Sequence, residues 1–328
     1  MKAFRCRVCQ NDLYFENSRC VSCGSRLGYS REEQEIVPVE DGRYVDAGGD
    51  TWYVCRNLSL SGCTWLTDVE GGQCLSCSLT RTRPNDADVE GLVAYRTAEQ
   101  AKRHLVHELT VRGLPIVPKS VDEENGLAFD LLSSADENVV IGHANGVITI
   151  DLAESRASHR ERLREQLGEP YRTMLGHFRH ESGHYYEWQL VDGERRTTYR
   201  ELFGDETTSY QEALDRHYDE GAPAGWEASY ISSYATMHPF EDFAETWAHY
   251  LHICDTIETA SEYGLTTVGA IDSFQHFGDV VAGIWVPLSV ALNMINRSMG
   301  HDDLYPFVIP APVRDKLEFV ASLTRNNG

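Results

Sequence analysis

Two histidines four residues apart constrain the fold of this chain more than any other feature. They lie in the stretch from Gly168 to Trp188, which reads GEPYRTMLGHFRHESGHYYEW. Pro170 has a fixed φ and no amide hydrogen to leave unpaired, so the sequence predicts a helix that begins there. On such a helix His180 and His184 lie one turn apart on the same face. Two imidazoles in this arrangement can bind one metal ion.

Glu181 adds another functional group to this helix. It follows His180 directly and can reach a water on the metal, which completes the H-E-x-x-H arrangement of zinc hydrolases. In the plainer alternative the histidines are half-buried polar residues, and a downstream ligand decides between the two. His177 shares roughly the same face, but a fourth protein ligand would close a catalytic site. We therefore expect His177 to pack or to contact the site from outside the ligand set.

A second helix is predicted to carry the missing ligand, because a catalytic zinc has three protein ligands and one open position. The stretch from Ser232 to His252 reads SSYATMHPFEDFAETWAHYLH, with Pro239 at the predicted helix start. Glu241 and Glu245 lie one turn apart on this helix. One carboxylate can bind the metal while the other orients a ligating histidine.

The residues on these two helices resemble those of known metallopeptidases. An H-E-x-x-H helix followed by a helix with a glutamate ligand is similar to the gluzincin class. Tyr234, Glu241, Phe243, Ala244 and Glu245 have the order and spacing seen in the catalytic domain of anthrax lethal factor. Over nearly its whole length, the chain resembles the bacterial family of zinc-binding metallopeptidases with an N-terminal zinc ribbon. The stretches that carry this resemblance are GHFRHESGHYYEW, HPFEDFAETWAHYLH, NMINRSMGHDDLYPFVIP and CLSCSLTRTRPND.

The resemblance implies a role for each residue of the site. Glu181 would be the general base that takes a proton from the attacking water. Tyr234 would donate a hydrogen bond to the oxyanion, and Glu245 would orient a histidine ligand, His180. The implied function is hydrolysis of peptide bonds in a peptide or protein substrate. The catalytic zinc would have three ligands, namely His180, His184 and Glu241.

Two other functional classes fit parts of the pattern. The same metal chemistry hydrolyses any planar amide, so a zinc hydrolase acting on a non-protein or isopeptide amide is one alternative. The other is a non-catalytic zinc-ribbon scaffold that binds proteins, but such a scaffold would be expected to lack the base or a ligand.

The negative charge of the chain limits the classes of partner that we expect. The 328 residues include 51 acidic and 29 basic ones, which gives a net charge of −22 with neutral histidines. Such a surface repels phosphate groups, so we expect neither nucleic acid nor an anionic membrane as a partner. The first residues, MKAFRCRVCQNDLYF, lack the apolar core of a signal peptide, and no run of about twenty apolar residues follows. We therefore expect a cytoplasmic protein.

Eight cysteines near the N-terminus predict two structural zinc sites, because cytoplasmic thiols bind metals more often than they form disulfides. The first site is two C-x-x-C pairs made of Cys6, Cys9, Cys20 and Cys23. The second site comprises Cys55, Cys63, Cys74 and Cys77. Its first pair is spaced more widely than usual, so the alternative is that Cys55 or Cys63 is merely buried. The expected total is one catalytic and two structural zinc ions, and the ribbons also offer a surface for a protein partner.

The predicted fold class is α+β, with a mainly helical zincin-like metallopeptidase domain that contains a small sheet and follows zinc-ribbon modules. The expected segments are a ribbon over 1–29, an acidic, Gly-rich linker over 30–50, a second ribbon-like module over 51–84 and the zincin-like domain over 85–328. Strands are expected over 127–132 and 139–152. Helices, besides the two above, are expected over 98–112, 153–166, 207–217, 226–232, 285–299 and 313–323.

Overall fold

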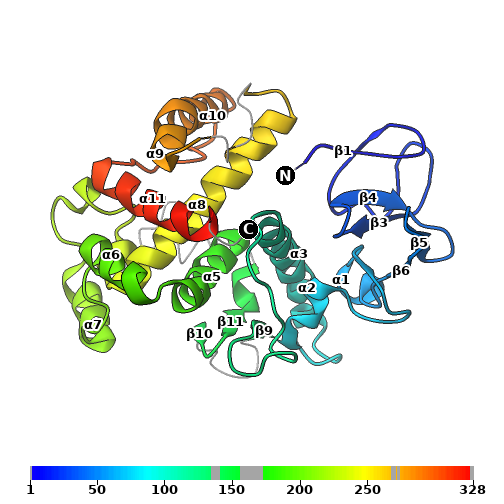
Figure 1. Ribbon diagram of the computed structural model, residues 1–328, viewed down its shortest axis with the longest axis horizontal. Coiled ribbons are helices and arrows are strands. Elements are labelled where there is room, and N and C mark those ends of the chain that lie inside the picture. Colours follow the sequence, from blue (N-terminus) through cyan, green and yellow to red (C-terminus); the bar gives the residue numbers. More distant parts are fainter. Residues whose placement is uncertain (1, 134–140, 156–172, 267–270, 272–273, 326–328) are drawn as a thin grey trace. The chain divides into compact units, whose positions relative to one another are not determined.

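The computed structural model of the chain describes residues 2–133, 141–155, 173–266, 271 and 274–325. They fall into two compact units. The described residues of the N-terminal unit lie within Lys2–Thr110 and Pro115–His159, and those of the C-terminal unit lie within Val111–Leu114 and Arg160–Gly328. Helices accompany several small sheets, so the fold is of the predicted α+β class (Figure 1).

Short strands and tight turns make up most of the first 80 residues. They form two hairpins and one three-stranded antiparallel sheet, each too small to bury a core of its own. The one-turn helices α1 (Leu58–Ser61) and α2 (Leu75–Ser78) lie between and after these strands. The paired strands are β1 (Phe4–Arg5) with β2 (Asp12–Leu13), β3 (Leu27–Ser30) with β4 (Glu35–Pro38), and β6 (Thr51–Val54) with β5 (Arg43–Val45) and β7 (Leu66–Thr67).

The stretch 30–50, expected to be a linker, contains strands β4 and β5. β4 pairs with β3 in a register that runs from Leu27↔Pro38 to Ser30↔Glu35. Val37 and Val39 are buried and form a small cluster with Leu66. The β-branched residues Ile36, Val37 and Val39 favour strand structure, and turns beside them contain Glu32, Glu33, Asp41 and Gly42.

A long helix and a four-stranded sheet complete the N-terminal unit. α3 (Val89–Val111) begins well before the predicted start at residue 98. The strand order is β10 (Gly142–Ala144), β11 (Val147–Asp151), β9 (Ala128–Leu132) and β8 (Thr80–Thr82), with β9 parallel to both β8 and β11. The single strand predicted over 139–152 is a hairpin instead. Asn145 and Gly146 have φ values of 50° and 77° and reverse the chain between β10 and β11.

Helices dominate the C-terminal unit (Figure 1). α5 (Met174–Leu190) packs along α8 (Pro239–Glu262), and both α6 (Gly193–Phe203) and α11 (Ala311–Arg325) pack on α8. α9 (Phe277–Val280) continues through the π-helical turn η5 (Val281–Trp285) into α10 (Val286–Ser298). The connection from α6 to α8 carries α7 (Tyr210–Glu220) and the 3₁₀ turns η2 (Trp226–Ala228) and η3 (Tyr234–Thr236). The buried aromatic residues of this unit include Phe178, Tyr186, Tyr199, Phe203, Phe243, Trp247 and Phe319.

Most predicted helices are present with shifted ends. α10 and α11 correspond to the predictions over 285–299 and 313–323, and α7 begins slightly later than predicted. The prediction over 226–232 was too long, because only the single turn η2 forms there. The helix predicted over 153–166 lies mainly outside the described residues, and its first residues belong to the 3₁₀ turn η1 (Leu152–Ser155).

The first metal helix begins later than Pro170, a residue that lies outside the described part of the chain. Thr173 is extended, with φ −123° and ψ 157°, and its hydroxyl accepts a hydrogen bond from the Gly176 amide at 2.9 Å. This side chain satisfies one of the free amides at the helix start, so α5 begins at Met174.

One helical stretch of the described chain is long and apolar enough to cross a membrane by length and composition alone. It is Phe277–Ser298, with 22 residues and a mean hydropathy of 1.5. Asp279 and Arg297 interrupt it, so it contains no unbroken apolar run of the length expected for a span. A core helix of a folded protein meets the same criteria, and this stretch is therefore weak support for a membrane span.

Gly183, inside the H-E-x-x-H segment, allows α5 and α8 to approach closely. A Cβ atom built on Gly183 would lie 2.8 Å from the Ala244 Cα and 3.2 Å from the Trp247 Cβ. Neither neighbour can rotate away, because one is backbone and the other is the first atom of a buried side chain. The close approach places the two metal helices near enough for their side chains to meet.

We expect Gly183→Ala to destabilise the C-terminal unit by about 1–3 kcal/mol, because the added methyl overpacks the helix interface. Chemical denaturation followed by circular dichroism measures this change. Gly278→Ala is the matched control, since a Cβ there meets no atom within 4 Å. The control should be neutral or slightly stabilising. Equal stability of the two variants would contradict the close approach.

Candidate metal centre

Helix α5 places two imidazoles on one face. His180 and His184 are separated by one helical turn, and their ring centroids are 5.0 Å apart. Both side chains are largely buried. The helical spacing predicted from sequence is therefore the spacing that the structure has.

Helix α8 brings Glu241, which follows His184 by 57 residues in the sequence, to the same point. His238 caps α8 by accepting a hydrogen bond from the Phe240 amide at 3.2 Å, and Pro239 occupies the first turn. Glu241 Oε2 lies 3.0 Å from His180 Nε2 and 3.5 Å from His184 Nε2. The three atoms lie within 4.8 Å of one another, as the ligands of one metal ion must.

These three residues suit a cation. Glu241 Oε2 is buried and makes no hydrogen bond, although both histidine Nε2 atoms are close. Burial alone would raise the pKa of Glu241, but the charge of His184 and the contact with His180 hold it well below its usual range. A cation bound between an ionised carboxylate and two imidazoles would satisfy all three groups. Nitrogen and carboxylate ligands in this number are those of a catalytic zinc site.

Two further side chains orient His180. Its Nδ1 donates to Glu245 Oε1 at 2.6 Å, and the other oxygen of Glu245 accepts a hydrogen bond from Ser232 Oγ at 2.7 Å. A proton on Nδ1 leaves the lone pair of Nε2 free to face the metal position. Burial lowers the pKa of His180, but Glu241 and Glu245 outweigh that effect and raise it well above its usual value. The two carboxylates therefore favour a positive charge at this position, and either a second proton on the ring or a metal ion at Nε2 supplies it.

The two carboxylate oxygens of Glu181 differ in their contacts. Its Oε1 lies 3.2 Å from His177 Nε2, while its Oε2 is buried and makes no hydrogen bond. Burial raises the pKa of Glu181, but the hydrogen bond from His177 and the charges of His184 and His180 lower it overall. The carboxylate form of Glu181 is therefore favoured, although the side chain is buried. His177 contacts this residue, in agreement with the role predicted for it outside the ligand set.

Tyr234 lies beside the histidines on the turn η3. Its ring centroid is 6.0 Å from that of His180 and 5.9 Å from that of His217. Burial, followed by the negative charge of Glu241, raises the pKa of Tyr234 far above its usual value. The hydroxyl therefore keeps its proton and can act as a donor.

The sequence did not predict the contact between Tyr210 and Glu241. At the start of α7, the Tyr210 hydroxyl donates to Glu241 Oε1 at 2.9 Å. In the sequence, Tyr210 lies between the two metal helices, and no motif marks it. Ser209 N-caps α7, which is a local signal for a helix start, but no spacing rule links Tyr210 to Glu241.

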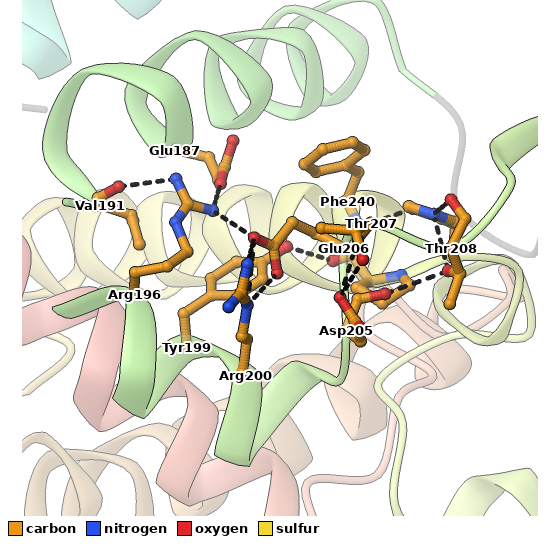
Figure 2. Close-up of polar contacts among 12 residues, drawn as sticks. Glu187, Val191, Arg196, Tyr199, Arg200, Asp205, Glu206, Thr207, Thr208 and Phe240 are labelled. Carbon is orange, nitrogen blue, oxygen red and sulfur yellow. Dashed lines mark hydrogen bonds and ion pairs between the residues drawn. The ribbon is translucent and has the colours of Figure 1, made fainter. Parts of the chain in front are cut away.

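A network of polar contacts fixes the chain that precedes Tyr210 (Figure 2). Arg196 on α6 pairs with Glu187 of α5 and donates to the Val191 carbonyl at 2.6 Å. Arg200 pairs with Glu206 at 2.7 Å. Tyr199 donates to the Pro239 carbonyl at 2.9 Å, at the first turn of α8. These contacts attach α6 and the following loop to both metal helices.

The four cysteines of the first group meet at the two knuckles of the ribbon. Cys6 Sγ lies 3.7 Å from Cys23 Sγ, and Cys9 Sγ lies 3.6 Å from Cys20 Sγ. Hydrogen bonds from Ser25 lower the pKa of Cys23 to about 6. Such a thiolate is the form that binds zinc. The four Sγ atoms lie within 4.8 Å of one another.

The second group is fully buried. Cys63 Sγ and Cys74 Sγ are 3.5 Å apart, and all four Sγ atoms lie within 4.8 Å of one another. The wide spacing between Cys55 and Cys63 accommodates the one-turn helix α1. In the structure, the four cysteines of each predicted group therefore lie close together.

Comparison with known proteins matches two families, and the boundary between the matches falls near residue 90, within the N-terminal unit. The model of a family described as "Putative zinc-binding metallo-peptidase" matches residues 92–323, and the model of a zinc-ribbon domain matches residues 3–88. Uncharacterized proteins of Mycobacterium bovis and of Mycobacterium tuberculosis are each 50% identical to the chain over 328 residues, which covers 98% of this chain and 94% of theirs. No solved structure matches the chain significantly.

Proposed function

Because the chain belongs to the family described as "Putative zinc-binding metallo-peptidase", we propose that it is a zinc-dependent peptidase whose catalytic zinc is bound by His180, His184 and Glu241. One observation carries the proposal. The buried Glu241 Oε2 has no hydrogen bond and lies 3.0 Å and 3.5 Å from two imidazole nitrogens. The spacing of the base and ligands, and their resemblance to gluzincins and to the catalytic domain of anthrax lethal factor, support a zincin-like site.

Zinc in such a site lowers the pKa of a bound water toward about 7 and polarises a carbonyl. The residues of the chain supply the proton transfers. Glu181 takes a proton from the attacking water through its free Oε2 and delivers it to the leaving amine. His177 holds the other oxygen of Glu181, so that the free one keeps its direction.

Three more residues have proposed roles, one at the substrate carbonyl and two beside a metal ligand. Tyr234, which keeps its proton, donates a hydrogen bond to the oxygen on which negative charge develops. Glu245 and Ser232 keep His180 in the tautomer that a metal ligand needs. The proposed substrates are peptides or proteins.

We expect the zinc-loaded full-length chain to cleave members of a peptide library. A His180→Ala/His184→Ala variant should be inactive, because it lacks two of the three ligands. Mass spectrometry of the products measures cleavage, with isopeptide-linked and cyclic amides tested in parallel. Cleavage of the isopeptide-linked or cyclic amides alone would favour the alternative function, a zinc hydrolase acting on a non-protein or isopeptide amide. Equal cleavage by the wild type and the variant would contradict the proposed site.

A further inference from the structure

Tyr210 is attached to the metal centre more firmly than the rest of its helix. α7 buries only Ala213, so most of this helix has little contact with a core. The loop before it is held at several points (Figure 2). Asp205 accepts hydrogen bonds from the Thr207 amide and hydroxyl, and the Thr208 hydroxyl and carbonyl each lie 3.2 Å from His238 Nε2.

His238 connects this loop to the ligand helix. Its Nδ1 accepts from the Phe240 amide at the start of α8, so its Nε2 carries the proton that faces Thr208. The Tyr210 ring lies against the same imidazole, with centroids 5.3 Å apart. The position of Tyr210 is therefore fixed relative to the first turn of α8, which carries Glu241.

The two oxygens of Glu241 have different surroundings as a result. Oε1 accepts the hydrogen bond from Tyr210, while Oε2 faces His180 and His184 and accepts none. A carboxylate can bind a metal through one oxygen or through both. A donor on Oε1 favours binding through Oε2 alone, which leaves the remaining position on the metal open for water.

We propose that Tyr210 is a positioning residue that holds Glu241 with one oxygen toward the metal and one oxygen away from it. This inference rests on the proposed zinc site. It assigns to the insert between α6 and α8 a direct part in shaping the ligand set.

The test compares Tyr210→Phe with Tyr218→Phe in the full-length chain. Tyr218 is on the same helix and is 64% exposed. Its replacement by Phe removes the same hydroxyl, but this hydroxyl makes no hydrogen bond to Glu241. Chelator competition measures the zinc affinity of the histidine site, and the His180→Ala/His184→Ala variant supplies the baseline of the cysteine sites. Cobalt replaces zinc in a second measurement, and its visible spectrum, after subtraction of the same baseline, reports the number of ligands.

Tyr210→Phe should weaken zinc binding at this site about 10- to 100-fold, the usual effect of losing a partner of a metal ligand. It should also weaken the visible cobalt bands, because a second carboxylate oxygen raises the coordination number. Tyr218→Phe should match the wild type in both, with an unchanged melting temperature for both variants. A Tyr210→Phe variant with wild-type affinity and spectrum overturns the inference alone. A wild type that binds no more metal than the double-alanine variant overturns the proposed function as well.

Discussion

Glu181→Gln should bind as much zinc as the wild type and yet lose peptide hydrolysis by about 10²- to 10⁴-fold in kcat, the usual contribution of a general base. Glutamine keeps the size of the side chain and a hydrogen bond to His177, but its carboxamide cannot accept a proton from water. The base proposed here has one oxygen bound to His177 and one buried oxygen without a hydrogen bond. The loss should therefore appear in the chemical step and leave the metal in place.

Zinc content by elemental analysis and kcat on a cleaved peptide are the two measurements. Glu201→Gln on α6 is the matched control, because this glutamate is exposed and makes no contact with the site in the described residues. It should retain wild-type activity. An undiminished rate in Glu181→Gln would remove Glu181 as the base, and a simultaneous loss of zinc would place it among the groups that hold the metal.

The metal centre could be predicted from sequence where it depends on spacing within one helix. His180 and His184 are one turn apart on any α-helix, and the same holds for Glu241 and Glu245. The convergence of the two helices was expected from the number of ligands that a catalytic zinc needs and from the resemblance, and no local spacing encodes it. In the structure it depends on Gly183, whose missing side chain lets α8 approach.

Contacts made through loops could not be predicted in this way. Tyr210 reaches Glu241 because Arg196, Arg200 and Thr208 fix the path of the insert. No local pattern encodes that path. The hairpin at Asn145 and Gly146 differs from these contacts, because Asn-Gly is a local sequence signal for a two-residue hairpin turn that the prediction of a single strand overlooked.

The cysteine sites lead to the largest expected effect on stability. Cys74→Ser should reduce the zinc content from three ions to two and unfold the N-terminal unit around the second group. Cys74 is only 1% exposed and lies 3.5 Å from Cys63, so serine leaves the remaining thiols without a complete ligand set. The loss is on the order of 10 kcal/mol, because binding of a structural zinc ion supplies the folding energy of such small modules. The strands here are too short to replace it with buried apolar surface.

Native mass spectrometry counts the zinc ions, and hydrogen exchange locates the unfolded segment. Cys254→Ser is the matched control, since Cys254 is equally buried but belongs to none of the three metal-ligating groups found among the described residues. It should keep three zinc ions and the exchange pattern of the N-terminal unit. If Cys74→Ser also keeps three ions and a protected N-terminal unit, the second group is not a zinc site. The buried thiols would then stabilise this unit by packing, and the wide spacing between Cys55 and Cys63 would need no metal to explain it.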